Sequence, residues 1–135
     1  MIKGSCCCGE VSFELAAKPT MMGTCHCTRC RKLGASVFVF VKSNDFSLTT
    51  GADAIATFPP TENYKYARTF CRFCGTALGE IGTQSESFPI AANCLDNTEG
   101  LVNKFHEFVA EKPDWYQICD QAPQFLRHPV FRDAP

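Results

Sequence analysis

The chain has 135 residues, of which 45% are hydrophobic and 20% charged, and its formal net charge is −1. This length and composition predict one globular domain spanning 1–135. A net charge this small excludes long-range attraction to a polyanion, and no run of Lys and Arg exceeds Arg31-Lys32, so we expect neither nucleic acid nor a membrane as a partner.

Short stretches typical of β-strands follow one another along the chain. Val11 to Leu15 alternates apolar and polar residues, as a half-buried strand does, and Ser36 to Val41 is a Val- and Phe-rich run suited to a strand buried on both faces. Between them, Thr28 to Leu33 is typical of a helical turn, and Gly34 closes it. The remaining expected strands are Phe46–Thr49, Ala54–Phe58, Tyr64–Phe70, Ala77–Ile81, Phe88–Asn93 and Lys104–Ala110.

The last part of the chain differs from the rest. Pro113, Pro123 and Pro129 predict a mostly irregular C-terminal segment. Together with the series of short strands, this pattern predicts a mainly β fold, with the strands largely antiparallel.

The ten cysteines raise the question of redox compartment. The N-terminal residues contain no apolar segment of the secretory type, and the longest strongly apolar run, Val37 to Val41, is far shorter than the roughly 20 residues of a membrane span. We therefore expect a soluble, cytoplasmic protein. In a reducing cytosol structural disulfides are rare, so metal binding is favoured over a disulfide scaffold.

Eight of the ten cysteines lie in three clusters, and seven of these eight, all but Cys7, have the spacing of metal ligands. Zinc prefers tetrahedral sulfur and nitrogen ligands, and two thiolates close in sequence can hold it from one tight turn. A glycine directly after a cysteine allows the backbone to turn beside the sulfurs. The clusters are Cys6-Cys7-Cys8-Gly9, Cys25-His26-Cys27-Thr28-Arg29-Cys30 and Cys71-Arg72-Phe73-Cys74-Gly75.

Seven sulfurs divide most simply into four and three. The pairs Cys6/Cys8 and Cys71/Cys74 can hold one ion from opposite sides, which gives a closed four-thiolate site of the structural type. The run Cys25, Cys27 and Cys30 then supplies three ligands from one local segment and leaves a fourth position for water or substrate. Spacing alone does not prove this division.

Three thiolates favour a particular chemistry at the second site. They donate strongly to the ion, so a bound water is acidified less than at a neutral three-histidine site. Soft, sulfur-rich surroundings instead suit an incoming thiol held as its thiolate. The pattern thus favours sulfur chemistry on a small thiol over hydrolysis.

These motifs resemble those of the glutathione-dependent formaldehyde-activating enzymes, a family that includes the centromere protein V relatives. Gly4 to Phe13 resembles the family's opening G-x-C-x-C-G followed by a strand, Cys25 to Lys32 its C-H-C-x-x-C-R-K segment, and Phe70 to Gly79 its F-C-x-x-C-G-x-x-L segment. Phe105-His106 and Lys112 to Tyr116 resemble a late histidine and a K-x-x-W-Y element.

The resemblance implies an Mss4-like β fold with two zinc ions. It implies a structural ion at Cys6, Cys8, Cys71 and Cys74, and a catalytic ion at Cys25, Cys27 and Cys30. The implied activity is that of a carbon–sulfur lyase, which joins formaldehyde to glutathione as S-hydroxymethylglutathione or reverses that step. Many family members act on other substrates. Cys7 departs from the pattern, because the middle position of C-x-C need not be cysteine.

Two interpretations remain open for His26, and one role is expected for each of the other histidines and cysteines. His26, between two expected ligands, points away from the ion and is either an acid–base group near the site or a surface histidine. His106 is expected as a satisfied core residue, and His128 on the surface of the tail. Cys94 and Cys119 have no partner motif and are expected as free core cysteines. Cys7 is expected as a free thiol.

Basic and aromatic side chains near these motifs are also open to two interpretations. Arg29, Arg31 and Lys32 either receive the carboxylates of glutathione or form a solvated basic face. Trp115 and Tyr116 are expected to pack over the β core. A competing hypothesis for the whole chain is a non-catalytic zinc module that binds protein or nucleic acid. The sequence leaves the physiological thiol, the aldehyde and the oligomeric state open.

Overall fold

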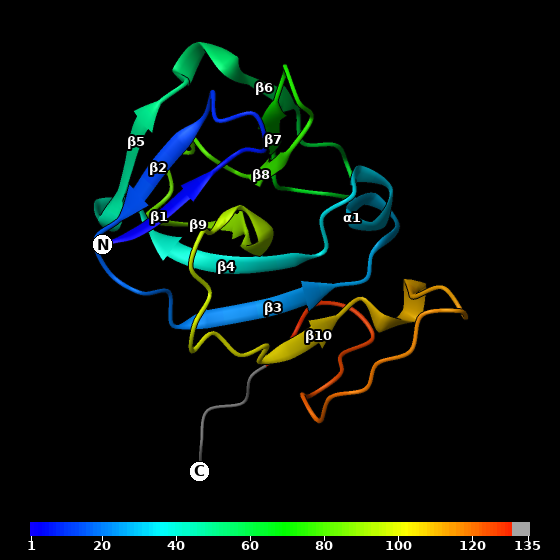
Figure 1. Ribbon diagram of the computed structural model, residues 1–135. Helices are drawn as coiled ribbons and strands as arrows, with labels where there is room; N and C mark the ends of the chain where they lie inside the picture. Colours follow the sequence, from blue (N-terminus) through cyan, green and yellow to red (C-terminus); the bar gives the residue numbers. More distant parts are fainter. Residues whose placement is uncertain (131–135) are drawn as a thin grey trace.

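The structure, a computed structural model, describes residues 1–130 and confirms the mainly β class. Figure 1 shows its short strands and single α-helix, α1. In chain order the elements are β1 (Ile2–Ser5), β2 (Ser12–Leu15), β3 (Met21–Cys25), α1 (Thr28–Leu33), β4 (Val37–Lys42), β5 (Phe46–Thr50), β6 (Ile55–Phe58), β7 (Arg68–Cys71), β8 (Ala77–Gly79), β9 (Ser87–Ala91) and β10 (Phe105–Glu107). Short 3₁₀ turns lie at Ser43–Asp45, Ala52–Ala54, Ala92–Cys94 and Val109–Glu111.

The strands form two sheets. A three-stranded antiparallel sheet has the order β1-β2-β5, and a seven-stranded sheet has the order β10-β3-β4-β9-β8-β7-β6. Nearly all neighbours in the larger sheet are antiparallel, but β10 pairs with β3 in parallel. This one parallel pair brings the end of β10 beside the end of β3, where the second cysteine cluster begins.

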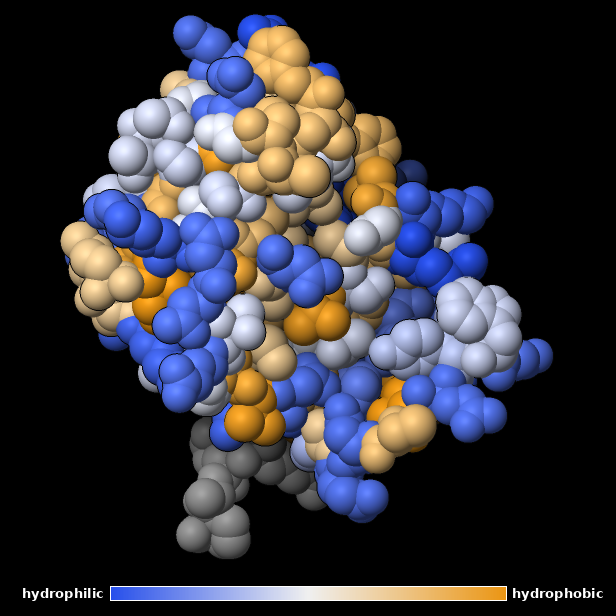
Figure 2. Space-filling model, in the orientation of Figure 1, coloured by the Kyte–Doolittle hydropathy of each residue, from blue (hydrophilic) through white to orange (hydrophobic). Residues whose placement is uncertain are grey.

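The core lies where buried side chains of the two sheets meet. Phe13 and Leu15 of β2 alternate with half-exposed residues, as expected for a half-buried strand, and join the same buried cluster as Val39, Leu78 and Ile90 of the larger sheet. On the face drawn in Figure 2, strongly hydrophobic side chains form small separate patches between hydrophilic ones. Within residues 1–130 no helix is long and apolar enough to cross a membrane.

Several strand boundaries differ from the sequence-based expectation. The strand expected from Tyr64 begins only at Arg68, because the preceding residues form a loop. The strand expected from Lys104 to Ala110 ends at Glu107, because Phe108 adopts a left-handed conformation, φ 54°, that starts a 3₁₀ turn. Strands β1 and β3 were not expected at all, since IKGS and MMGTC show neither alternation nor β-branched enrichment.

Helix α1 agrees with the expectation at both ends. Its N-cap is Cys27, whose Sγ accepts a hydrogen bond from the Cys30 amide, and its C-cap is Gly34 in the left-handed region with φ 84°. The carboxylate of Glu111 also accepts from the Thr28 amide at 3.0 Å. One ligand-type cysteine therefore caps the helix that carries another.

Candidate metal centres

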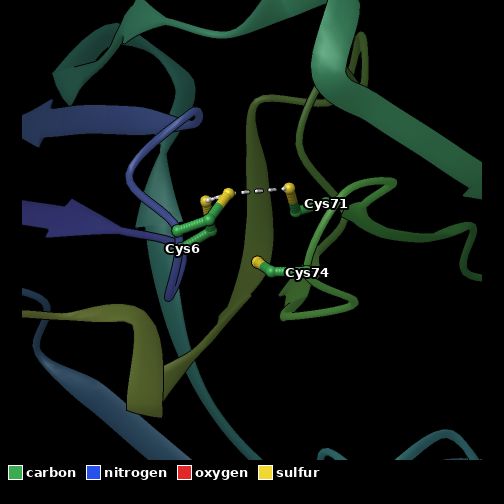
Figure 3. A group of neighbouring side chains, drawn as sticks. Cys6, Cys71 and Cys74 are labelled. Carbon is green, nitrogen blue, oxygen red and sulfur yellow. Dashed lines mark hydrogen bonds between the residues drawn. The ribbon is translucent and has the colours of Figure 1, made fainter.

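Four sulfur atoms from the first and third cysteine motifs come together and join the two sheets. We call this group the first cluster, and the group of Cys25, Cys27 and Cys30 the second cluster. Cys6 and Cys8 lie in the turn between β1 and β2, whereas Cys71 ends β7 and Cys74 lies in the turn before β8. The four Sγ atoms all lie within 4.8 Å of one another. Figure 3 shows the side chains of the two turns facing one another across this group, with a dashed line between sulfurs.

Each turn of the first cluster is shaped by a glycine. In the first turn the Gly9 amide donates to Cys6 O, and in the second the Gly75 amide donates to Cys71 O, at 3.1 and 2.8 Å. Both glycines have positive φ, 83° and 79°, which side chains with a Cβ rarely adopt. The expected role of glycine after the cysteines is therefore present in both turns. Thr76 connects them, because its Oγ1 accepts from the Cys7 amide at 3.0 Å.

The sulfur spacing of the first cluster fits a tetrahedral ion. Four thiolates at 2.3 Å from a zinc ion stand about 3.8 Å apart. The Sγ atoms of Cys6 and Cys8 lie 3.6 Å apart, and those of Cys8 and Cys71 lie 3.7 Å apart. No disulfide joins any of the cysteines in residues 1–130, which are all free. The group can therefore hold a metal ion without rearrangement.

The second cluster is built from one local segment. Cys25 is the last residue of β3, Cys27 caps α1, and Cys30 lies in its first turn. Their Sγ atoms also lie within 4.8 Å of one another, and all three residues are buried. Among residues 1–130, no fourth His, Cys, Asp or Glu ligand atom joins this group. The cluster can hold a metal ion with three protein ligands.

Buried charge beside the second cluster favours thiolates. The guanidinium of Arg68, which is buried, donates from Nη1 to Cys30 Sγ at 3.4 Å and stacks on the Phe38 ring at 4.9 Å. Hydrogen bonds from Cys25 and Cys30 hold the pKa of the Cys27 thiol far below its ordinary value. The pKa of Cys25 is raised by its hydrogen bonds to Cys27 and Cys30, so the three sulfurs favour a single negative charge shared among them.

A cavity of about 190 Å³ opens beside the three sulfurs. Aromatic rings supply much of its wall, and Phe38, Tyr64 and Phe108 pack directly against the cysteines. Ionisable residues line it as well, namely Arg29, Arg68, Glu62, Lys65, Glu107 and His128. A small molecule entering this cavity would reach the side of the cluster that carries no fourth protein ligand.

Glu107 is the most buried carboxylate in the cavity wall. The parallel register sets it opposite Cys25, and its backbone carbonyl accepts from the His26 amide at 2.9 Å. Burial raises the pKa of its carboxyl group. Its Oε2 lies 3.9 Å from His128 Nδ1, so a protonated His128 would pair with it. Sequence reasoning missed Glu107, because only the unusual β3–β10 pairing brings it to the cysteines.

Arg29 has a different role from the one considered in the sequence. Its Nη1 donates to Tyr66 O and its Nη2 to Pro59 O, at 2.6 and 2.9 Å, and its guanidinium stacks on Phe58 and Tyr64. These hydrogen bonds hold the loop 59–66 beside α1 and engage both Nη atoms, which leaves only the buried Nε of Arg29 without a partner. Its neighbours Arg31 and Lys32 are exposed, as the solvated-face interpretation expects.

Three polar side chains form a hydrogen-bonded chain behind the second cluster, in which the two histidines are buried and Asp120 is exposed. His26 Nε2 and His106 Nδ1 are 2.8 Å apart, and His106 Nε2 lies 2.9 Å from Asp120 Oδ1. An ionised carboxylate can only accept, so Nε2 of a neutral His106 carries the proton and its Nδ1 accepts from His26. The pKa of His26 is lowered by burial and by the nearby His106.

This chain of side chains excludes the surface interpretation of His26 and adds one residue that was not expected. His26 is buried rather than on the surface, and the Tyr116 ring packs edge-on against it, with the two ring centroids 5.2 Å apart. His106 is a satisfied core residue, as expected. Asp120 was missed, since a single acidic residue in an irregular segment gives no signal in the sequence. His128 is exposed, as expected, but lines the cavity.

Of the remaining expectations, those for Cys7 and Cys94 are confirmed and those for Cys119 and Trp115 are wrong. Cys7 is an exposed free thiol and Cys94 a buried one whose Sγ donates to Ala77 O, as expected. Cys119 is exposed, so its assignment to the core was wrong. Trp115 does not pack over the core either, because 76% of it is exposed. Both errors lie in the proline-rich segment, where few backbone pairings fix the chain.

Comparison with known proteins identifies a family. Residues 1–111 match the family model described as "Glutathione-dependent formaldehyde-activating enzyme". A crystal structure of a Rhodobacter sphaeroides protein is 24% identical, with a TM-score of 0.57, and the match covers 74% of this chain and 90% of that one. That likeness concerns the fold alone. No curated protein matches the chain.

Proposed function

The chain belongs to the glutathione-dependent formaldehyde-activating enzyme family, and we propose that it is a zinc-dependent carbon–sulfur lyase acting on small-thiol adducts. Its reaction would be of the S-(hydroxymethyl)glutathione synthase type, in which a thiol and an aldehyde combine or separate. Two zinc ions are proposed. Cys6, Cys8, Cys71 and Cys74 would hold a structural ion, and Cys25, Cys27 and Cys30 a catalytic one.

One observation carries the proposal. The three sulfurs of the second cluster line a cavity, and no fourth protein ligand joins them in residues 1–130. A catalytic zinc site has this form, with three protein ligands and one position left for substrate, whereas a structural site is closed. A non-catalytic binding module has no use for an open position beside a cavity. The geometry therefore favours the enzyme over that alternative.

The donor set also suits a thiol substrate. A zinc ion held by three thiolates would act as a Lewis acid that stabilises the substrate sulfur as a thiolate. The buried Arg68 adds a positive charge beside Cys30, which offsets part of the negative charge of the sulfurs. With that offset, a further anionic sulfur is tolerated in the cavity.

The bond changes follow from the chemistry of a hemithioacetal. In the synthetic direction the thiol gives its proton to water, its sulfur attacks the carbonyl carbon as the C=O π bond breaks, and the resulting alkoxide oxygen takes a proton back from water. In the reverse direction that proton leaves, the C–S bond breaks, and its electron pair returns to sulfur. The Phe38, Tyr64 and Phe108 rings limit water around the reacting atoms.

The test uses cobalt-substituted protein. Adding glutathione should change the sulfur-to-cobalt charge-transfer band, and glutathione with formaldehyde should form or lose adduct faster than the uncatalysed mixture. Cys27→Ser should abolish both responses while the band of the first site persists. Cys7→Ser is the matched control, because Cys7 is exposed and outside both clusters, and it should behave as the wild type.

Two results would count against the proposal. If no small thiol changes the spectrum of protein that holds two metal ions, the binding module becomes the better description. If thiols change the spectrum but no aldehyde adduct forms or breaks faster than background, thiol binding stands and the lyase activity is discarded.

A further inference from the structure

The cavity beside the second cluster is apolar where it meets the sulfurs. The rings of Phe38, Tyr64 and Phe108 pack against the cysteines, and Phe40 and Pro89 extend the same wall. Any substrate whose sulfur reaches the cluster must place the carbon groups next to that sulfur against these rings. Apolar groups gain free energy on entering such surroundings, whereas charged groups lose hydration.

The cations around the cavity are already engaged. Arg29 donates to two backbone carbonyls and Arg68 to Cys30 Sγ and Ala35 O. Lys65 Nζ lies over the Tyr66 ring at 5.1 Å. His128 faces Glu107. Among residues 1–130 the guanidinium Nε atoms of Arg29 and Arg68 have no hydrogen-bond partner, but both are buried, so a carboxylate of glutathione would have to lose its hydration to reach them.

The acidic residues oppose glutathione as well. Glu62 and Glu107 both line the cavity, so an incoming carboxylate would meet like charges. The volume of about 190 Å³ is also below the roughly 300–1,000 Å³ of sites that enclose drug-sized ligands. A cavity of this volume can enclose the cysteinyl part of the tripeptide, and the charged arms would have to extend past Glu62 and Glu107.

Resting on the proposed function, we propose that the thiol received here is compact and uncharged and carries an apolar alkyl or aryl group. The sulfur reaches Cys25, Cys27 and Cys30, and the apolar group lies against Phe38, Tyr64 and Phe108. The aldehyde adduct of such a thiol is the preferred substrate class of this chain, ahead of the adduct of glutathione.

Isothermal titration calorimetry of the zinc-loaded full chain tests this inference. Phenylmethanethiol, 2-mercaptoethanol and glutathione serve as probes that differ in apolar group and charge. Phenylmethanethiol should bind about tenfold or more tightly than glutathione, because it buries a ring where the tripeptide must desolvate charges. The uncharged 2-mercaptoethanol, which lacks the ring, should lie between them.

Substitutions in the cavity wall test which side chains produce the preference for phenylmethanethiol. Tyr64→Ser should remove most of the preference for phenylmethanethiol, while Tyr64→Leu, which keeps an apolar wall, should retain it. Glu62→Lys should strengthen glutathione binding severalfold, because it replaces a repelling carboxylate by a free cation. Phe73→Ala is the matched control, since that ring is exposed beside the first cluster and does not line the cavity, and it should leave all three affinities unchanged.

The failures can be told apart. If glutathione binds as tightly as phenylmethanethiol or more so, the apolar class is wrong while the thiol site stands. If the preference exists but survives Tyr64→Ser, the apolar group lies elsewhere and the inference is overturned. If none of the three thiols binds, the proposed function fails and the inference fails with it.

Discussion

The two cysteine clusters differ in solvent exposure, and the difference is the opposite of what a structural and a catalytic role would suggest. In the proposed structural group Cys8 and Cys74 are exposed, whereas every sulfur-bearing residue of the proposed catalytic group is buried. Sequence distance separates them more usefully. Cys8 and Cys71 stand 63 positions apart and their sulfurs are 3.7 Å apart, whereas the second group occupies one turn and the start of one helix.

The comparison teaches which property assigns a role to a thiolate cluster. A closed set of four ligands that spans two sheets links segments that lie far apart in the sequence. A three-ligand set on one local segment links nothing distant, and what marks it is the cavity on its open side. Span and coordination number, rather than solvent exposure, separate the two roles.

The largest loss of stability is expected from substitutions that break the metal link between the two sheets. Cys71→Ser or Cys74→Ser should unfold the domain or abolish its expression, because a structural zinc contributes on the order of 10 kcal/mol to folding, which is comparable with the whole stability of a domain. Cys25→Ser or Cys30→Ser should cost about 2 kcal/mol. Thermal unfolding followed by circular dichroism measures the difference, and equal destabilisation by both pairs would contradict the four-plus-three division.

Metal removal should follow the same order. A chelator should take the ion of the second cluster first, with little change in circular dichroism, because three ligands beside a cavity release metal more readily than a closed four-ligand set. Loss of the remaining ion should coincide with unfolding. Zinc content and circular dichroism measured along one chelation course decide this, and simultaneous loss of both ions with unfolding would remove the distinction between the sites.

A smaller effect is expected from the chain of His26, His106 and Asp120. His106→Ala should lower the metal affinity of the second cluster roughly tenfold, because the residue between two ligands loses the partner that orients it. Asp120→Asn should have a weaker effect in the same direction. Cobalt titration monitors each cluster separately, and the band of the first cluster should not move.

Asp114→Asn is the control for this experiment, since it removes an exposed carboxylate from the same segment. It should leave both cobalt affinities unchanged. If His106→Ala lowers thermal stability but leaves the second band and its affinity intact, the histidines stabilise the fold without positioning the ligands.

The smallest effect is expected at the cysteines outside the clusters. Cys94→Ala and Cys119→Ala should both leave the zinc content unchanged, because neither sulfur joins a ligand group. Cys94→Ala should lower stability by about 1 kcal/mol, since it opens a small space in the core, and Cys119→Ala should not. Atomic absorption and thermal unfolding measure these effects, and a missing zinc equivalent in either variant would show that the clusters are misassigned.

Local patterns predicted much of this molecule. The cysteine clusters, helix α1 and its glycine cap, and strands such as β2 all follow from spacing or alternation within a few residues. Ligand spacing brings the sulfurs together within each turn, whereas the approach of Cys6 and Cys8 to Cys71 and Cys74 depends on the fold. The same local signals identified glycine at positive φ in both turns of the first cluster.

Features that depend on distant pairing were not predictable. Glu107 reaches the second cluster through the parallel pairing of β10 with β3, and no local pattern specifies that partner. Asp120 reaches His106 from an irregular segment. Arg29 was considered as an anion receptor because a guanidinium fork suits carboxylates equally well, and only the fold brings two backbone carbonyls to it.

The hydrogen bonds from Arg29 to the backbone of the loop 59–66 also bear on how substrate specificity can change in evolution. Every residue carries a backbone carbonyl. Substitutions at positions 62–65 therefore leave the carbonyl acceptors of Pro59 and Tyr66 in place. Side chains facing the cavity can thus be exchanged while the loop stays anchored. A lineage can acquire a new substrate here by point mutation, and a combinatorial library over these positions would sample new specificities on an unchanged scaffold.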